Sequence, residues 1–363
     1  MALEDHRFPC DNCGSDLRFD PGDERLVCDH CGNVEIIEHG PWTQSRAIAE
    51  QDFEAALKAL PDDPVMEVTR VSQCPNCGAR VEFDPDLHAT ECPFCATPVV
   101  TDTGPSRQIK PRAVLPFALE EKEAREAMTE WLGALWFAPN GLQEYARKGR
   151  RLSGIYTPCW TFDADTKSSY NGARGIVYYE DHKVVRNGRH EIRRVAKVRW
   201  TPASGRVARF FDDVLIVASE ALPKRFRSGI ANWDLTRLEP YLPEYLAGFR
   251  AEAYTVELEQ AFREARGVMD RQILRDVKFD IGGDRQRVEH VETRIRDVTF
   301  KHILVPVWLA AYKYRGRSYR FVVNGQTGAV SGERPWSAWK IACAVVAAMI
   351  LAAITGYFYA QGQ

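Results

Sequence analysis

Positive charge is scarce in the first hundred residues of this 363-residue chain, where 7 Lys and Arg stand against 20 Asp and Glu. A nucleic-acid-binding surface needs Lys and Arg to neutralise phosphates, so this segment is a poor candidate for contact with DNA or RNA. The remaining residues carry 41 basic and 30 acidic side chains, and the net charge of −2 therefore conceals an acidic head and a basic body. A hydrophobic content of 45% and a charged content of 27% exclude a disordered or fibrous chain.

The motifs of the common catalytic classes are also missing. No G-x-x-x-x-G-K-[ST], G-x-S-x-G, H-E-x-x-H or G-x-G-x-x-G pattern occurs, which excludes a P-loop ATPase or helicase motor. His190-Glu191 is followed by Ile-Arg-Arg194, so the second histidine of a zincin is absent. Asp212-Asp213 predicts a turn rather than a catalytic pair of carboxylates. We therefore expect a protein that is not an enzyme.

The N-terminal residues Met1–Asp5 contain neither a basic nor an apolar region, so we expect no secretory signal peptide. Without a signal peptide we expect the ten cysteines to stay in the reducing cytoplasm. In that compartment, clustered cysteines indicate metal binding or catalysis rather than disulfides. Cys159 and Cys343 lie apart from the other cysteines in apolar segments, and we expect both to be inert packing residues.

Eight cysteines form two blocks of identical spacing, Cys10-x2-Cys13-x14-Cys28-x2-Cys31 and Cys74-x2-Cys77-x14-Cys92-x2-Cys95. The residues between the cysteines match as well, since Gly14 and Phe19-Asp20-Pro21 correspond to Gly78 and Phe83-Asp84-Pro85. The pattern is an internal duplication, in which every matched position of the second block follows its counterpart at one constant offset.

Paired Cys-x2-Cys knuckles are typical of a zinc ribbon, in which four thiolates surround one ion tetrahedrally. Gly14, Gly32 and Gly78 allow the backbone to turn around the metal. An iron–sulfur cluster is a less favoured occupant, and His30 is a less favoured ligand because the two blocks match at cysteine. Four cysteines leave no open coordination position, so the sequence predicts two structural Zn²⁺ ions. The acidic charge of both blocks favours protein partners over nucleic acid.

These features predict an α+β protein with the following ranges: zinc ribbon 1 over 1–36, a linker helix within 37–68, zinc ribbon 2 over 69–101, a linker over 102–112, and an α+β body over 113–335. Apolar periodicity predicts helices over 44–60, 119–137 and 255–274. Strand-like runs occupy 155–163, 174–180, 193–200, 207–218, 303–314 and 317–323. Tyr156-Thr-Pro158-Cys-Trp160 resembles Leu304-Val-Pro306-Val-Trp308, so the body is either one domain or two related halves.

An uncharged run of 19 residues, Ile341–Tyr359, is long enough to cross the hydrocarbon core of a bilayer. Aromatic residues flank both ends, as at membrane interfaces: Trp336, Trp339, Tyr357, Phe358 and Tyr359. Arg334 and Lys340 precede the run and no charge follows it, which places the body in the cytoplasm. The alternative is a buried core helix, but the run has no polar stripe. We expect a transmembrane helix over 340–359 that anchors the chain by a single pass in the inner (cytoplasmic) membrane.

Basic residues gather in the body at Arg147-Lys148, Arg150-Arg151, Lys183, Arg186, Arg189, Arg193, Arg194, Lys197 and Arg199. Three interpretations stay open: the solvated face of a sheet, a surface attracted to anionic lipid heads, and a nucleic-acid site.

The cysteine blocks resemble transcription-factor-IIB-type zinc ribbons. The layout is similar to bacterial double-zinc-ribbon, single-pass membrane proteins found beside flotillin-like (SPFH-domain) and phage-shock-type proteins. The resemblance includes the block Val305-Pro-Val-Trp308, Tyr319-x-Phe-Val-Val-Asn-Gly-Gln-Thr-Gly328 and Gly332-Glu-Arg-Pro335 before the membrane helix. It implies a non-enzymatic scaffold that recruits such proteins to the inner membrane during envelope stress.

Related ribbons are also labelled primosomal-helicase-like, although this chain lacks the helicase motifs. The alternative function is therefore a nucleic-acid-binding protein of replication or transcription that uses the basic body. A zinc-dependent enzyme is disfavoured because sites formed by four cysteines are closed.

Overall fold

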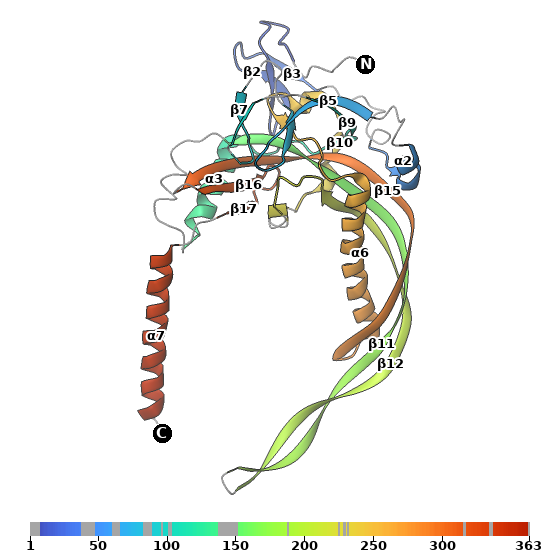
Figure 1. Cartoon of the computed structure of the whole chain (residues 1–363), viewed down its shortest axis with the longest axis vertical. Coiled ribbons are helices and arrows are strands. Elements are labelled where there is room, and N and C mark those ends of the chain that lie inside the picture. Colours follow the sequence, from blue (N-terminus) through green and yellow to red (C-terminus); the bar gives the residue numbers. More distant parts are fainter. Residues whose placement is uncertain are drawn as a thin grey trace.

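Three long strands dominate the computed structural model of the chain (Figure 1): β11 (Ser153–Arg186), β12 (Arg189–Val217) and β15 (Arg285–Tyr314). The structure describes residues 8–37, 48–59, 66–82, 89–95, 97–100, 104–136, 152–186, 189–223, 226–227, 230, 232–314, 317–333 and 337–361. Within these ranges the protein is mixed α+β, with two four-cysteine groups and one apolar C-terminal helix, as predicted.

The long strands lie in one sheet of order β12-β11-β15-β10-β13, where β10 is Ala113–Val114 and β13 is Glu239–Pro240. Short strands extend this sheet at its margins: β4 (Gln51–Asp52), β14 (Arg250–Ala251), β16 (Arg317–Asn324) and β17 (Val330–Gly332). Two 3-10 turns, η1 (Leu235–Arg237) and η2 (Pro243–Leu246), flank β13. The sheet curves into an arch with one long descending side.

The prediction of four separate strands over 155–218 was wrong, because the structure joins them into β11 and β12. The intervening residues alternate in exposure but not in polarity. Thr166 and Ser168 are buried although they are polar, whereas Lys167 and Ser169, each next in the chain, are exposed. Hydrophobic periodicity does not detect such a strand. Hydrophobic periodicity also misses the first part of β15, which begins at Arg285 and not at the predicted residue 303.

Helix α6 (Leu258–Ile281) covers the inner face of the arch. Its buried residues recur every three or four positions: Leu258, Ala261, Ala265, Met269, Ile273, Val277 and Ile281. The helix is longer than the predicted 255–274 because Val277 and Ile281 continue the same stripe. A hydrogen bond and an ion pair hold the C-terminal turns of α6 to the sheet. The Tyr170 hydroxyl donates to Asp280 at 2.5 Å, and Arg209 pairs with Asp276 at 2.6 Å.

The descending side of the arch is here called the leg, and it comprises residues 164–186, 189–210 and 285–296 together with α6. β15 joins it at Arg285, which lies opposite Gly175. Beyond Gly175 the only described strands are β11 and β12, which continue as a two-stranded hairpin to Arg186 and Arg189. Eleven residues of extended chain make this hairpin roughly 35 Å long.

The two similar Pro-containing segments of the body pair with each other. Pro158 lies opposite Leu304, and Tyr156 lies opposite Pro306, in antiparallel register. Each segment belongs to a strand that follows a helix, α3 (Glu121–Gly133) before β11 and α6 before β15. The body therefore places its two similar segments side by side.

The remaining elements surround this body. Helix α2 (Phe53–Ala59) lies within the predicted helix 44–60, of which 44–47 and 60 lie outside the described residues. The expected linker 102–112 contains β9 (Gly104–Ile109), which pairs with β5 (Met66–Gln73). Helix α7 (Ala338–Gln361) contains the predicted segment 340–359. The basic cluster 147–151, the Pro139-Asn140-Gly141 stop of the predicted helix 119–137, and Arg334, Pro335 and Trp336 also lie outside the described residues.

The contact of α6 with the polar strands should dominate the stability of the leg. Replacing buried Met269 by Ala removes side-chain volume between helix and sheet and should lower the free energy of unfolding by about 2–5 kcal/mol. The matched control is Phe279→Ala on the same helix, because Phe279 is 91% exposed and its loss should change stability by less than about 0.5 kcal/mol. Thermal unfolding of the full chain in detergent measures both, and equal effects would contradict this account of the packing.

Candidate metal centres

The first cysteine module comprises residues 8–37 and contains a three-stranded sheet of β1 (Leu17–Asp20), β2 (Arg25–Cys28) and β3 (Val34–Ile36). Both of its knuckles turn in the same way. The Gly14 N–H donates to the Cys10 carbonyl at 2.8 Å, and the Gly32 N–H donates to the Cys28 carbonyl at 2.9 Å. Both glycines have φ near 74°, in the left-handed region that favours glycine. The backbone thus directs two pairs of sulfurs toward one point.

The four sulfurs of this module form cluster 1, which consists of Cys10, Cys13, Cys28 and Cys31. The Cys10–Cys31 and Cys13–Cys28 sulfurs are 3.6 and 3.5 Å apart, and all four lie within 4.8 Å of one another. Four sulfurs at about 2.3 Å from a tetrahedral ion would be about 3.8 Å apart, whereas a disulfide requires about 2.05 Å. The spacing is that of a metal site.

The second cysteine module comprises residues 66–109 and contains β5, β6 (Arg80–Glu82), β7 (Ala89–Glu91), β8 (Pro98–Val100) and β9. Its sulfurs form cluster 2, which consists of Cys74, Cys77, Cys92 and Cys95. The Cys74–Cys95 and Cys77–Cys92 sulfurs are 3.6 and 3.7 Å apart. The Gly78 N–H donates to the Cys74 carbonyl at 2.9 Å, as in the first module.

The structure thus brings together all eight predicted cysteines as two groups of four, each of which could hold a metal ion. His30 is exposed and does not belong to cluster 1. A backbone hydrogen bond from Ser15 lowers the pKa of Cys13 to about 6. Burial acts to raise the pKa of Cys95, but hydrogen bonds with Thr97 and Asn76 outweigh it and lower that pKa to about 6. In each cluster one thiol, Cys13 or Cys95, therefore ionises more readily than a free cysteine, while burial and the shared hydrogen bond raise the pKa of its partner, Cys28 or Cys74.

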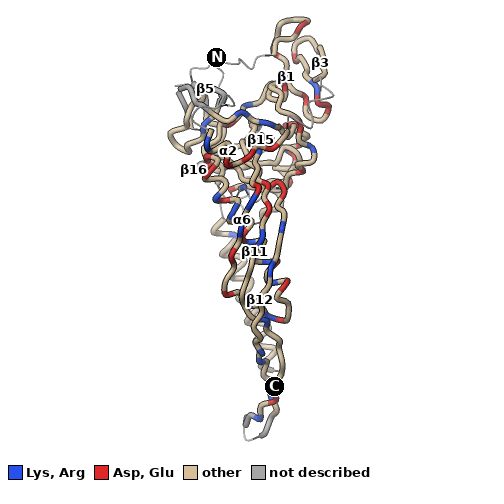
Figure 2. Tube along the Cα trace, turned by 90° about the vertical axis from the view of Figure 1, so that its right-hand side faces the viewer, with Lys and Arg blue, Asp and Glu red and all other residues tan. Residues whose placement is uncertain are grey.

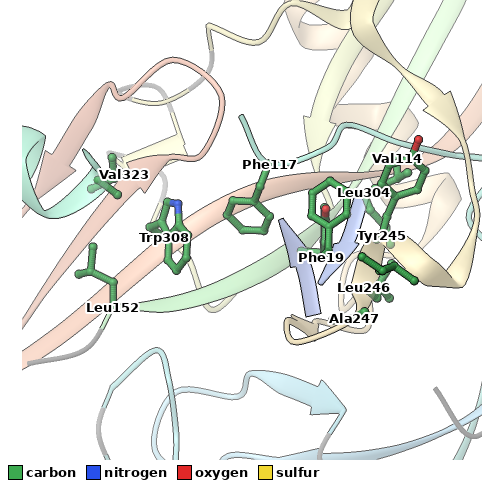
Figure 3. Close-up of a cluster of buried hydrophobic side chains, with 14 of the residues drawn as sticks. Phe19, Val114, Phe117, Leu152, Tyr245, Leu246, Ala247, Leu304, Trp308 and Val323 are labelled. Carbon is green, nitrogen blue, oxygen red and sulfur yellow. The ribbon is translucent and has the colours of Figure 1, made fainter. Parts of the chain in front are cut away.

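The first module packs against the body, with Phe19 at the centre of the contact and Leu17, Leu26 and Ile37 in the same buried cluster. Phe19 is fully buried, and its ring lies 5.4 Å from that of Tyr245 and 6.4 Å from that of Phe249. The Phe19 N–H donates to the Ala247 carbonyl at 3.0 Å. Figure 3 shows Phe19 directed into the cluster that also contains Phe117 and Leu304. Strand β1 is therefore attached to the body.

The second module is joined to the body by backbone pairing. Val81 forms a β-bridge with Glu252, and the Ala253 N–H donates to the Arg80 carbonyl at 2.9 Å. Its cysteines pack in a hydrophobic cluster with Leu222 and Phe226. The two metal centres consequently differ in access to solvent: two cysteines of cluster 1 are exposed, whereas three of cluster 2 are buried and the fourth is partly buried.

A fully buried carboxyl lies beside this junction and was missed by the sequence analysis. Glu252 accepts a hydrogen bond from the hydroxyl of Ser219. Burial raises the pKa of Glu252 to about 8. Burial also raises the pKa of neighbouring Cys159 well above its ordinary value, in keeping with the expected inert role of that thiol. A lone Glu in a sequence gives no signal of such burial.

The segment that joins the two modules is held to the sheet by an ion-pair network that was also missed. Lys301 Nζ lies 2.8 Å from Asp213 Oδ1 and 3.2 Å from Glu50 Oε1. Thr299 donates to the same Glu50 carboxylate at 2.5 Å. Burial and the adjacent Glu50 raise the pKa of Asp163 to about 7.

The turn predicted at Asp212-Asp213 was wrong, because both residues lie within β12. They stand where β12 and β11 shift register between Phe162 and Ala164, and Asp213 has a φ of 50°. A bulge accounts for the irregular backbone that the sequence analysis interpreted as a turn.

Helix α7 is long and apolar enough to cross a membrane over Ala338–Tyr359, and within the described residues it is the one helix of this kind. At 1.5 Å per residue its 22 residues extend about 33 Å. None of this segment is buried against the rest of the protein, so the alternative of a core helix does not apply. Figure 1 shows α7 extending away from the arch, apart from α6.

Comparison with known proteins finds one relative of nearly full length. The chain is similar to YdjG, an uncharacterized protein of Bacillus subtilis (strain 168), with 27% identity over 341 residues that cover 92% of both chains. No protein-family model matches the chain, and no solved structure matches it. The similarity to YdjG extends well beyond the cysteine motifs.

The geometry of the clusters predicts two metal ions per chain. Elemental analysis of the purified protein should find two ions, and Cys74→Ser with Cys77→Ser should reduce the content to one. A chelator should remove the ion of cluster 1 faster than that of cluster 2, because Cys13 and Cys31 are exposed. Simultaneous loss of both ions, or fewer than two ions in the unmodified protein, would contradict the assignment.

The raised pKa of Glu252 should make stability depend on pH. The folded chain retains the proton of Glu252 up to about pH 8, whereas the unfolded chain releases it near 4.5. The stabilisation is therefore complete below about pH 4.5 and is lost as pH rises to about 8, by ~1.4 kcal/mol per pH unit within that window. Glu252→Gln should remove this slope from thermal unfolding measured at pH 5 to 8. Glu126→Gln, at an exposed position on α3, should leave the slope unchanged.

Proposed function

We propose that the chain is a non-enzymatic, membrane-anchored scaffold, in which two zinc ribbons capture protein partners and α7 holds them at the inner membrane. The observation that supports this most directly is the combination of two closed four-sulfur groups with an uncovered apolar helix in one chain. A closed metal site stabilises a small binding module but offers no coordination position to a substrate. A fully exposed apolar helix needs a lipid or protein environment.

Zinc is the metal that the donor set favours. In each cluster two pairs of sulfurs are 3.5 to 3.7 Å apart and all four lie within 4.8 Å of one another, which matches tetrahedral zinc coordination. Both clusters are formed on short two- and three-stranded sheets with glycine turns, which is the arrangement of a zinc ribbon. The zinc would support modules that are too small to form a large core of their own.

The first module offers the clearer docking surface for proteins. Ile36 is 80% exposed and Val34 is 45% exposed on β3, in a module that carries seven Asp and Glu against two Arg over residues 8–37. Exposed apolar side chains on a charged module are typical of a protein–protein interface. The second module provides a further contact, so that a partner bound at both sites gains avidity. The resemblance to proteins found beside flotillin-like and phage-shock-type proteins suggests partners of those kinds.

The orientation of the anchor follows from charge. Arg334 and Lys340 lie on the N-terminal side of the uncharged run Ile341–Tyr359, which favours a cytoplasmic body. The arch and both modules would then face proteins of the cytoplasm or of the inner membrane surface.

The alternative function, nucleic-acid binding in replication or transcription, is favoured by one observation, the basic character of the leg. Its three strand segments carry 15 Lys and Arg against 6 Asp and Glu. Polyanion binding through this sheet would not involve the acidic modules.

The proposal predicts partners that survive nuclease treatment. Affinity purification of the full chain from nuclease-treated, detergent-solubilised membranes should recover defined membrane-associated proteins, identified by mass spectrometry. The Cys74→Ser, Cys77→Ser variant should lose these partners because its second module unfolds, while the variant stays in the membrane fraction. Normal capture by the variant would overturn the docking role of that module.

Two controls separate the elements of the proposal. A chain ending before Trp336 should be released into the soluble fraction, and retention through high-salt washing would overturn the anchor. If nuclease removes all partners and nucleic acid is present in the untreated sample, the alternative function replaces the scaffold.

A further inference from the structure

The leg has one covered and one uncovered face. α6 packs on the inner face, where Thr166, Ser168 and Tyr170 are buried. The outer face carries the alternate residues of the same strands, and each of the following is exposed: Asp165, Lys167, Ser169, Asn171, Arg206, Ala208, Phe210, Arg285, Arg287, His290, Glu292, Arg294 and Arg296. No described element covers this outer face.

The outer face is basic with an apolar contact near its upper end. Six of its residues are Lys or Arg and two are acidic, while exposed Glu289 lies at a bulge of β15. Phe210 lies in one row with Asp165 and Arg296 across the three strands, and its side chain is 60% exposed. Figure 2 shows Lys and Arg distributed along β11 and β12. α6 itself has five basic and five acidic residues, so the excess positive charge belongs to the strands.

A surface of the opposite character exists on the same chain. The first module carries seven Asp and Glu against two Arg over residues 8–37. Asp16 and Asp29 are exposed there, together with the apolar side chains of Val34 and Ile36. The two surfaces are therefore complementary in charge, and each has an exposed apolar contact.

These surfaces cannot meet within one molecule. Phe19 is buried between Tyr245 and Phe249, which fixes the first module to the body. In Figure 1 the module lies at the end of the molecule opposite to the tip of the leg. Contact between them requires a second copy of the chain.

We infer that the outer face of the leg of one copy binds the first cysteine module of a second copy. The contact joins two different surfaces, the outer face of the leg and the first module. Each copy carries both surfaces, so the assembly continues as a ring or a linear array. Charge pairs at the rim make it sensitive to salt, and Phe210 with Ile36 contributes an apolar centre. The inference is independent of the membrane anchor, because neither surface includes α7, and it assigns the docking surface of the first module to a second copy of the chain. A lipid surface fits less well, since the outer face is turned away from α7.

Charge reversal tests the assembly directly. Sedimentation velocity of the full chain in detergent should show species larger than the monomer in 50 mM salt and the monomer in 500 mM salt. Arg294→Glu with Arg296→Glu should be monomeric in both, because the acidic module is then repelled. The matched control is Arg271→Glu with Arg275→Glu, which places the same charge change on the exposed side of α6 and should assemble like the unmodified chain.

Complementation excludes loss of folding as the explanation. Asp16→Arg with Asp29→Arg should also be monomeric in 50 mM salt, and mixing it with the Arg294→Glu, Arg296→Glu protein should restore a two-component species. The unmodified chain remaining monomeric in 50 mM salt, or failure of the mixture to associate, would overturn the inference. Disassembly on nuclease treatment would overturn it in favour of nucleic acid on the outer face. Assembly only with vesicles containing anionic lipid would overturn it in favour of a membrane surface.

Discussion

Strands β11 and β15 pair along most of the length of β15, and strands β4, β10, β12, β14 and β16 each pair with one of these two strands. Alternate side chains of their upper halves serve different cores. Tyr156 and Trp308 contribute to the core beneath the first module, whereas Ile155 and Cys159 contribute to the core beneath the second. One antiparallel pairing therefore determines where both metal centres lie. A one-residue slip in its register would exchange the two sets of side chains.

The sequence was sufficient to predict what depends on local geometry. Cysteine spacing predicts the two four-sulfur groups because each Cys-x2-Cys turn forms within a few residues. The uncharged run predicts α7 because the number of its residues gives the length of the helix. Burial that arises from distant contacts leaves no such pattern. Thr166 and Ser168 are covered only because α6 packs on them, and Glu252 is enclosed by segments far away in the chain. The long strands and the buried carboxyls could not be predicted for this reason.

The two modules share a ligand pattern but differ in what holds them. The first is attached mainly by the insertion of Phe19 into an aromatic cluster, and the second by backbone pairing with the sheet and by burial of its cysteines. Identical spacing in the sequence thus gives one exposed centre and one enclosed centre. If the centres hold zinc, they are equivalent as coordination sites but not as surfaces for recognition.

The packing of Phe19 against Tyr245 also affects the order in which the parts of the chain can fold. Its partner Tyr245 comes much later in the chain, and β11 meets β15 only after the whole of α6 has been made. The cysteines of the first module leave the ribosome long before their docking site exists. Until then, any order in this module can come only from its own residues and from a metal ion bound by its cysteines. Such long sequence separation slows folding, so a metal-stabilised first module would reduce the time that its apolar side chains spend exposed.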